Sequence, residues 1–333
     1  MNSNLIDHCN VSNPDTYQVL SWLMVGQFSL GLPLNLSVLY VFLFRFKFWR
    51  NKSVFLFNIV VADFLLVVCL PIKIHDFQHN LRRSQTDAVC KTMLFMLFLN
   101  RGASIVFLIL LSLDRYFSVV HLRRRNCIKG FNKTPLKCVG IWMLLLVLTT
   151  PTMVGTFDCC NSLGRAPNET EHTATDVCRE FIFFAQIVVP FIILVFCTSR
   201  IIRRLRQKTV GEKMRLRRAV FAVMSVVVVF SLCFLPCAVA RVALLWVRLK
   251  KDEAAEEVVV QVYDSLMVLS YTDCLLDPLV YCFCNSGFKD AYISSFFPKV
   301  LQKHLLRPDP NQVHTTTVTT ATPSIPKLTP RVT

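Results

Sequence analysis

Long apolar runs recur along the chain, and they restrict what it can fold into more than any other feature of the sequence. Hydrophobic residues make up 53% of its 333 residues. A helix that spans a bilayer needs about 20 mainly apolar residues, because the hydrocarbon core is about 30 Å thick. The segments that reach this length are 21–44, 53–76, 88–120, 137–157, 181–202, 217–247 and 258–284. The sequence therefore predicts an all-α membrane protein, a bundle of seven transmembrane helices.

The segments outside this bundle, which spans 21–284, differ from it in composition. Residues 1–20 are polar and lack the basic start of a cleaved signal peptide, so we interpret them as an amino-terminal segment that stays in place. Residues 285–300 have the pattern of a short amphipathic helix on the membrane surface. Residues 301–333 are rich in Pro and Thr, which predicts a disordered tail.

Positive charge gathers at one set of segment ends. Most of the 37 Lys and Arg residues lie in 45–52, 123–137, 200–218 and 289–331. Loops rich in Lys and Arg stay in the cytoplasm. The amino terminus is therefore predicted to be extracellular and the tail cytoplasmic. The net charge of +16 then faces anionic membrane lipid and cytoplasmic partners, and it does not require nucleic acid.

Two glycosylation signals lie on the predicted outer side. Asn10 and Asn168 begin the triplets Asn-Val-Ser and Asn-Glu-Thr. The Asn-X-Ser/Thr pattern is the acceptor for N-linked glycosylation. Both asparagines are therefore candidate glycosylation sites.

Five cysteines also lie on the outer side, where disulfides persist. We expect Cys90, at the start of the third segment, to pair with Cys160 in the long loop before the fifth. Cys9 is expected to pair with a remaining loop cysteine, for which Cys178 is a candidate. Five is an odd number, so one thiol stays free, and spacing alone does not identify it.

An arginine inside an apolar helix is the main candidate for ligand binding. Arg101 lies 11 residues after Cys90, about 16 Å along a helix, which is half the depth of the hydrocarbon core. Arginine stays charged there, and its burial costs about 2.5–3.5 kcal/mol. It must therefore face the bundle interior and meet an anion. That anion is either a ligand carboxylate held by two parallel hydrogen bonds or the side chain of Asp273.

Motifs in all seven segments resemble those of rhodopsin-like G-protein-coupled receptors, in order and at family spacing. They are Asn35 in GLPLNLSVLY, Asp63 in NIVVADFLL, Asp114-Arg115-Tyr116, Trp142, Pro190, CFLP at 233–236 and DPLVY at 277–281. Within that class, MLFLNRGASIVFL and CFLPCAVARV look like the cluster of receptors for hydroxycarboxylic acids and for oxo- and hydroxy-eicosanoids. The resemblance implies a plasma-membrane receptor for a carboxylic acid, with Arg101 as the carboxylate anchor and coupling to inhibitory G proteins that lower cAMP.

Four further residues are weaker candidates for ligand contacts. The resemblance places Tyr271 as a hydroxyl donor to the carboxylate, and a core tyrosine bonded to a neighbour is the alternative. Arg241, at the outer end of the sixth segment, is either a second contact for the anion or a rim charge in water. Lys73 and Ser162 are rim or loop candidates, for which a solvated side chain is the more common outcome.

Polar residues midway through the bundle are expected to converge, and the family binds a sodium ion in this region. The set is Asp63, Asn100, Ser104, Asp273 and Asp277. A hydrated polar network without a fixed ion is the alternative, and the sequence predicts no other cofactor.

A second set of residues is assigned to G-protein coupling. Arg115 lies 14 residues after Arg101, about 21 Å deeper, and reaches the cytoplasmic mouth. The resemblance groups it with Asp114, Tyr116 and Tyr281. The tail threonines from Thr315 to Thr320 are candidate sites for receptor kinases and arrestin, and a plain polar tail is the alternative.

Other functions have less support in the sequence. A receptor for another anion, such as a nucleotide or an acidic peptide, is the nearest alternative. A carboxylate transporter is more remote, since the chain shows no internal repeat. There is no Cys/His cluster with metal-ligand spacing and no nucleophile motif, so enzymatic activity is not expected.

Overall fold

Helices account for almost all of the structure in a computed structural model, which describes residues 13–45, 51–79, 87–120, 134–150, 174–206, 210–284, 286–299 and 301–302. No strand occurs within these ranges. The helices are α2 (Pro14–Tyr40), continued by the π-helical turn η1 (Val41–Arg45), α3 (Asn51–Gln78), α4 (Asp87–Val120), α6 (Thr134–Thr149), α8 (Ala174–Arg206), α9 (Val210–Lys250), α10 (Glu253–Ser270), α11 (Asp273–Cys284) and α12 (Ser286–Phe296). Each apolar segment predicted from the sequence corresponds to one of these helices or to a pair of them.

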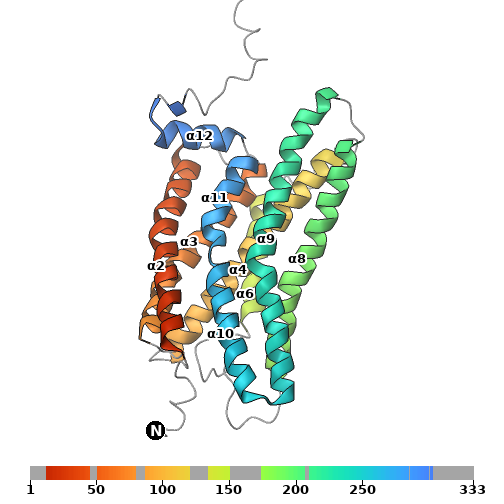
Figure 1. Ribbon diagram of the computed structural model, residues 1–333. Coiled ribbons are helices and arrows are strands. Elements are labelled where there is room, and N and C mark those ends of the chain that lie inside the picture. Colours follow the sequence, from red (N-terminus) through yellow and green to blue (C-terminus); the bar gives the residue numbers. More distant parts are fainter. Residues whose placement is uncertain are drawn as a thin grey trace, which may run out of the picture.

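The long helices lie side by side, and α12 crosses one end of the bundle (Figure 1). Along the chain, α2 contacts α3, α3 contacts α4, α4 contacts α8, α8 contacts α9 and α9 contacts α10. Contacts between α11 and α2 close this ring. The interior is therefore enclosed by helices from both ends of the sequence.

Five of the described helices are long and apolar enough to cross a membrane. They cover Pro14–Arg45, Val54–Gln78, Ala88–Phe117, Glu180–Arg206 and Val223–Lys250. A sixth span follows if Ala254–Cys282 and Gly287–Phe296, bent by 109°, are taken as one broken span. The helical membrane bundle is thus confirmed, whereas the count of seven spans stays a prediction.

The fourth segment is the one that falls short in length. Helix α6 has 16 residues, about 24 Å at 1.5 Å per residue, which is less than the hydrocarbon core. The predicted segment, 137–157, continues seven residues past the described part of the chain. The structure therefore does not test whether this helix crosses the bilayer.

The first helix begins earlier than the sequence predicted. Helix α2 starts at Pro14 rather than at residue 21. Proline is favoured at the first position of a helix because its missing N–H would have no partner there, and Asp15 in the first turn suits the helix dipole. Residues 14–20, assigned to the amino-terminal segment, therefore belong to the bundle.

The seventh segment is interrupted rather than continuous. Helix α10 starts after Asp252, whose side chain accepts the N–H of Ala255 at 3.1 Å, and it ends at Ser270. Tyr271 and Thr272 form a turn before α11 starts at Asp273. This break sets the direction of Tyr271 and Asp273, which matters for the cavity described below.

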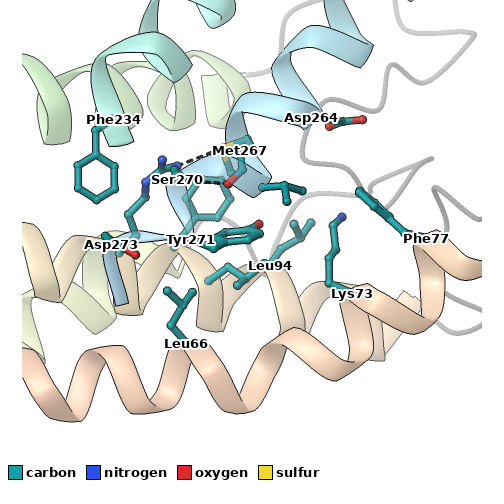
Figure 2. Close-up of a pocket in the computed structure, with 14 residues that line it drawn as sticks. Leu66, Lys73, Phe77, Leu94, Phe234, Asp264, Met267, Ser270, Tyr271 and Asp273 are labelled. Carbon is teal, nitrogen blue, oxygen red and sulfur yellow. Dashed lines mark hydrogen bonds between the residues drawn. The ribbon is translucent and has the colours of Figure 1, made fainter. Parts of the chain in front are cut away.

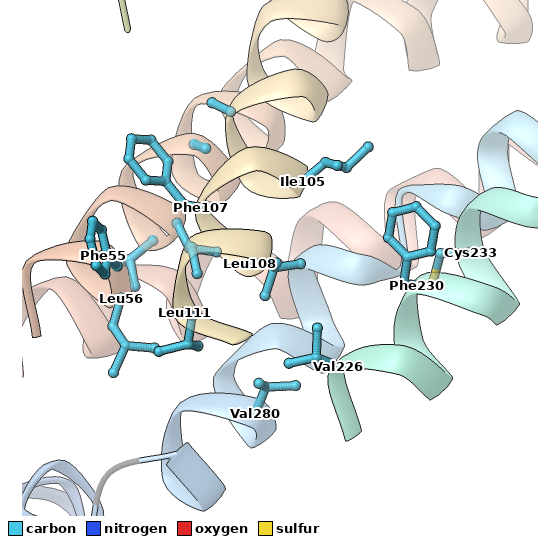
Figure 3. Close-up of a cluster of buried hydrophobic side chains, with 14 of the residues drawn as sticks. Phe55, Leu56, Ile105, Phe107, Leu108, Leu111, Val226, Phe230, Cys233 and Val280 are labelled. Carbon is cyan, nitrogen blue, oxygen red and sulfur yellow. The ribbon is translucent and has the colours of Figure 1, made fainter. Parts of the chain in front are cut away.

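Apolar side chains fill the bundle in two main clusters. The larger one joins α3, α4, α9 and α11 through residues such as Phe55, Phe107, Val226 and Val280 (Figure 3). The second cluster joins α2, α3, α4, α10 and α11 at the end of the bundle where α2 begins. On α4 the buried polar pair Asn100-Arg101 lies between Leu97 of the second cluster and Ala103 of the larger one.

Candidate ligand site

A cavity lies among α3, α4, α9, α10 and the turn before α11 (Figure 2). Its empty volume is about 600 Å³, including the part open to solvent. The apolar lining residues are Leu66, Phe77, Leu94, Leu97, Phe98, Phe234, Met267 and Val268. The polar ones are Lys73, Arg101, Asp264, Ser270, Tyr271 and Asp273. The cavity is therefore a mostly apolar space with a few ionisable groups, which is the usual composition of a site for an organic ligand.

Arg101 lies in this lining and is 8% exposed. Its Nη1 donates to the Sδ atom of Met267 at 3.1 Å, and its guanidinium carbon lies 4.9 Å from the centre of the Phe234 ring. A thioether is a weak acceptor, and a ring face attracts a cation without neutralising it. Nε and Nη2 are buried and make no hydrogen bond to any described residue. Two donors of a buried cation thus remain available.

Asp273 lines the same cavity without holding Arg101. Its Oδ1 accepts the backbone N–H of Cys274 at 2.7 Å. No hydrogen bond joins its carboxylate to the Arg101 guanidinium in the described residues. The internal ion pair that the sequence left open as an alternative is therefore not formed as a direct contact.

The opposite side of the cavity holds a second cation. Figure 2 places Lys73 and Phe77 on one side and Phe234 and Asp273 on the other. The Lys73 ammonium lies 4.8 Å from the centre of the Phe77 ring, and the residue is only 6% exposed. Lys73 was expected to be solvated, and this expectation is wrong, because its side chain is buried in the bundle, where α3 packs against α2 and α4.

Asp264 lines this side of the cavity, and Tyr17 contacts it from α2. The Tyr17 hydroxyl donates to Oδ2 of Asp264 at 2.7 Å, and its ring meets the Phe77 ring edge-on at 5.0 Å. Tyr17 belongs to the first turns of α2, which the sequence analysis did not include in the bundle. The early start of α2 therefore supplies a hydrogen-bond donor to Asp264, a residue of the cavity lining.

Tyr271 is buried and lines the cavity from the turn between α10 and α11. This position agrees with the place that the family resemblance gave it. Its hydrogen bond to a ligand stays a prediction.

Arg241 is neither a rim charge nor part of the cavity lining. It is 3% exposed, its Nε donates to Oε2 of Glu180 at 2.9 Å, and its Nη2 donates to Oε1. The rings of Phe183 and Tyr263 each lie 5.4 Å from its guanidinium carbon. This two-point ion pair joins α9 to the first turns of α8. Neither alternative that the sequence left open for Arg241, a second contact for the anion in this cavity or a rim charge in water, describes its position.

The sequence analysis missed Glu180, Asp264 and Met267. Helical periodicity could have identified the last two, because Asp264, Met267 and Tyr271 follow one another at spacings of three and four residues and so share one helix face. Glu180 carried no such signal, because its partner is 61 residues away in the chain.

The expected polar network forms in part. Oδ2 of Asp63 accepts the hydroxyl of Tyr281 at 2.6 Å, and Ser104 donates to Oδ2 of Asp277 at 3.4 Å. The side chain of Asn100 and Oδ1 of Asp277 are buried without a hydrogen-bond partner among the described residues. Tyr281, which the sequence grouped with the coupling motif, thus belongs to this network.

The three aspartates of this network do not form a metal-binding site by themselves. Within the described part of the chain, no group of three or more His, Cys, Asp or Glu side chains is arranged to hold a metal ion. The unpartnered oxygens of Asn100 and Asp277 nevertheless fit a small cation that is bound by mixed oxygen ligands. Whether the network holds sodium stays a proposal.

The Asp114-Arg115-Tyr116 motif lies near the end of α4. Tyr116 is buried, and its ring contacts Phe117 at 5.2 Å and Phe196 of α8 at 5.8 Å. Asp114 and Arg115 are half-buried. The motif is therefore anchored to α8 through its tyrosine.

The structure describes two of the five cysteines that are predicted to lie on the outer side. Cys90, at the start of α4, is disulfide-bonded. Cys178 is an exposed free thiol, so the pair Cys9–Cys178 is not present. Other sequence candidates, namely Cys9, Asn10, Cys160, Ser162, Asn168 and the tail threonines, lie outside the described residues.

Comparisons with known proteins agree with this architecture. The model of the family described as 7 transmembrane receptor (rhodopsin family) matches residues 34–281. Hydroxycarboxylic acid receptor 2 of Homo sapiens is 32% identical over 297 residues, 86% of this chain and 80% of that protein. The 12-(S)-hydroxy-5,8,10,14-eicosatetraenoic acid receptor of Mus musculus is 30% identical over 296 residues, 86% of this chain and 91% of that protein. Oxoeicosanoid receptor 1 of Homo sapiens is 27% identical over 272 residues, 81% of this chain and 70% of that protein.

These relatives are receptors and not enzymes, which confirms the expectation about enzymatic activity. Receptors of this kind are multi-pass proteins of the plasma membrane that bind a small molecule and act on a G protein. The motifs, the helical bundle and the extent of the match lead to one conclusion. The chain belongs to the rhodopsin family of seven-transmembrane receptors.

Proposed function

We propose that this receptor binds a carboxylic acid through Arg101, either a hydroxycarboxylic acid or an oxidised fatty acid, and signals through inhibitory G proteins to lower cAMP. The observation that carries the proposal is the unpaired edge of a buried guanidinium inside a cavity. The names of the relatives, which specify hydroxycarboxylic acids and eicosanoids, support the ligand class.

The geometry of Arg101 suits a carboxylate. Nε and Nη2 lie on the same edge of the guanidinium plane, and both lack a hydrogen-bond partner among the described residues. A carboxylate approaching that edge accepts two parallel N–H bonds, the strongest form of arginine–carboxylate contact. Met267 and Phe234 hold the group from its other sides, so little side-chain freedom is left to lose on binding.

The rest of the cavity favours a single carboxylate on an apolar body. Leu94, Leu97 and Val268 offer hydrocarbon surface between Arg101 and the outer side. Asp264 and Asp273 also line the space, and their negative charge would repel a ligand that carries several phosphates. An organic monocarboxylate therefore fits better than a nucleotide.

Ring contacts offer a route from the ligand to the moving part of the bundle. The Phe234 ring contacts the Arg101 guanidinium on one side and Phe230, at 5.1 Å, on the other. Phe230 in turn stacks with Phe191 of α8 at 6.4 Å. A carboxylate on Arg101 changes the charge that Phe234 faces, next to Pro236 of α9, and so shifts the population of α9 positions.

The remaining elements of the proposal concern topology and regulation. The chain crosses the membrane seven times with its amino terminus outside, and α12 lies on the inner surface. The Cys90–Cys160 disulfide and glycans on Asn10 and Asn168 are on the outer side. Phosphorylation of the tail threonines by receptor kinases recruits arrestin.

A sodium ion would be held by oxygens of Asp63, Asn100, Ser104 and Asp277, where it would supply positive charge to a buried acidic layer. Without a ligand, the chain's own contribution there is the Tyr281–Asp63 hydrogen bond and the Ser104–Asp277 hydrogen bond.

Inhibition of forskolin-stimulated cAMP in transfected cells tests the function. Wild type, Arg101→Ala and Lys91→Ala would be compared at equal surface expression, with acids from lactate and butyrate to hydroxy-eicosanoids. Lys91→Ala is the matched control, since Lys91 is a half-buried cation of α4 that does not line the cavity. We expect wild type and Lys91→Ala to respond to at least one acid and Arg101→Ala to lose that response.

Other outcomes point elsewhere. A response that survives Arg101→Ala contradicts the anchor. A response to nucleotides or acidic peptides but to no simple carboxylate supports a different anionic ligand. Uptake of labelled carboxylate that is independent of G protein supports a transporter.

A further inference from the structure

Two histidines share one face at the end of α3. His75 and His79 are four residues apart, so their side chains lie one above the other on the helix. Their ring centres are 4.2 Å apart and their planes are inclined by 31°. The His75 side chain is 60% exposed, and His79 is exposed as well. Both rings are thus accessible from solvent and lie within reach of a single small ligand.

Hydrogen bonding sets which nitrogen of His79 points outward. Nδ1 of His79 lies 2.8 Å from the backbone oxygen of His75. A carbonyl oxygen only accepts, so Nδ1 carries the proton and Nε2 of the neutral ring keeps its lone pair.

The carboxylate of Asp76 lies near Nδ1 of His75. Its Nδ1 lies 3.9 Å from Oδ1 of Asp76. Histidines that bind metals commonly direct one ring nitrogen to a carbonyl or carboxylate and coordinate with the other. His79 has this arrangement, whereas the His75 Nδ1–Asp76 contact is longer than a hydrogen bond. Both rings keep Nε2 as a possible ligand.

We propose that His75 and His79 form a binding site for a divalent transition metal, with Zn²⁺ as the representative ion. Imidazole nitrogen suits Zn²⁺, Cu²⁺ and Ni²⁺ and is a poor ligand for Mg²⁺ or Ca²⁺. The sequence analysis found no Cys/His cluster with metal-ligand spacing, and it passed over this pair: histidines four residues apart on a helix have the spacing that helical zinc sites use. In a tetrahedral site with each Nε2 about 2.0–2.1 Å from the ion, the two ring centres lie farther apart than the present 4.2 Å, so the rings must rotate away from each other to bind.

The chain supplies two ligands and water supplies the others. Within the described residues, no third His, Cys, Asp or Glu is placed to complete the coordination sphere. Asp76 follows His75 in sequence, but its side chain is only 6% exposed, so it is not counted among the ligands of the ion.

The site is separate from the proposed ligand cavity. Neither histidine lines that cavity, although Phe77 and Lys73 of the same helix end do. The metal site therefore stands independently of the carboxylate function, and each can fail without the other.

Zn²⁺ binding to purified full-length receptor in lipid nanodiscs tests the proposal, measured by equilibrium dialysis with radioactive zinc. We expect saturable binding that EDTA reverses, with at least tenfold weaker affinity in His75→Ala and in His79→Ala. Gln78→Ala is the control, since Gln78 is exposed between the two histidines, and its affinity should stay within twofold of wild type.

The same proteins loaded with Cu²⁺ give a second measurement. Electron paramagnetic resonance should detect two imidazole nitrogens in wild type and one in each single variant. If an alanine variant does not fold, His75→Asn and His79→Asn replace it. Absence of saturable Zn²⁺ binding in wild type, or equal affinity in wild type and the double variant, overturns the proposal.

Discussion

The hydroxyl of Tyr281 donates a 2.6 Å hydrogen bond to Oδ2 of Asp63 and joins α11 to the middle of α3. Both side chains are fully buried, and 218 residues separate them in the chain. A carboxylate oxygen in the bundle interior needs such a hydrogen-bond donor, because a buried acceptor without a partner costs free energy. The bond therefore holds two distant parts of the bundle in register.

Removal of this donor should destabilise the receptor. Tyr281→Phe keeps the ring, which packs edge-on against Phe288, and leaves Oδ2 of Asp63 unpaired. We expect the free energy of unfolding to fall by about 1–3 kcal/mol. Thermal melting of the purified protein in detergent measures the effect. Tyr292→Phe is the control, since its hydroxyl bonds Ser37 at 3.0 Å in a half-buried position and its loss should cost less. Equal melting temperatures for the two variants would contradict the prediction.

The buried pair of Arg241 and Glu180 should respond asymmetrically to mutation. Glu180→Leu leaves a cation that is 3% exposed, whereas Arg241→Met leaves a carboxylate that is 22% exposed and partly hydrated. Breaking a buried pair costs about 3–5 kcal/mol, so we expect Glu180→Leu to approach that loss and Arg241→Met to cost less.

The double variant and the ligand response complete this test. Glu180→Leu with Arg241→Met should recover much of the stability, because two apolar side chains replace the pair. The potency of carboxylic acids should be unchanged in the double variant, since Arg241 does not line the cavity. Melting curves and cAMP assays measure the two effects, and a large loss of potency would place Arg241 in the ligand site.

Two glycines should give opposite results when changed to alanine. A Cβ atom on Gly102 would lie 3.3 Å from the side chains of both Gln186 and Leu145, because α4 approaches α6 and α8 closely there. A Cβ atom on Gly26 would meet nothing within 4 Å. Alanine in a helix interior is favoured over glycine by about 1 kcal/mol. We therefore expect Gly26→Ala to raise the melting temperature and Gly102→Ala to lower it or leave it unchanged. Similar stabilisation in both variants would contradict the close packing beside Arg101.

The shape of the Arg101 guanidinium should matter as well as its charge. Arg101→Lys keeps a cation at this depth but replaces the two-donor edge by a single ammonium. We expect the potency of responding carboxylic acids to fall at least tenfold while receptor expression is retained. Concentration–response curves for cAMP measure this shift. Unchanged potency would mean that charge alone is recognised and that the free edge of Arg101 has no role.

The sequence located the helices well, and it located the site in part. Apolar length was enough to find every segment, because the bilayer sets a minimum that few other folds share. Apolar length did not predict that the first helix begins at Pro14 or that the seventh is interrupted at Tyr271. A proline start and a turn of two residues change hydropathy very little, so averages over about 20 residues do not detect them.

The depth of Arg101 and the requirement that it be buried followed from its position in the chain alone. A permanent charge at that place in an apolar helix must face inward. The choice of partner for each buried charge was a matter of tertiary structure. Arg241 has a carboxylate from Glu180, whereas Arg101, among the described residues, donates to the sulfur atom of Met267 and faces the Phe234 ring without a carboxylate partner.

The physical reason is that side chains pair according to the rotation and depth of helices that are far apart in sequence. The early turns of α2 bring Tyr17 to Asp264, and after the break before α11 the Asp273 carboxylate accepts the backbone N–H of Cys274 and makes no hydrogen bond to Arg101. Hydropathy and motif spacing carry no information about such rotations. The sequence by itself thus determined a membrane bundle with a buried cation, and the packing of the helices decided that Nε and Nη2 of this cation meet no hydrogen-bond partner in the described part of the chain.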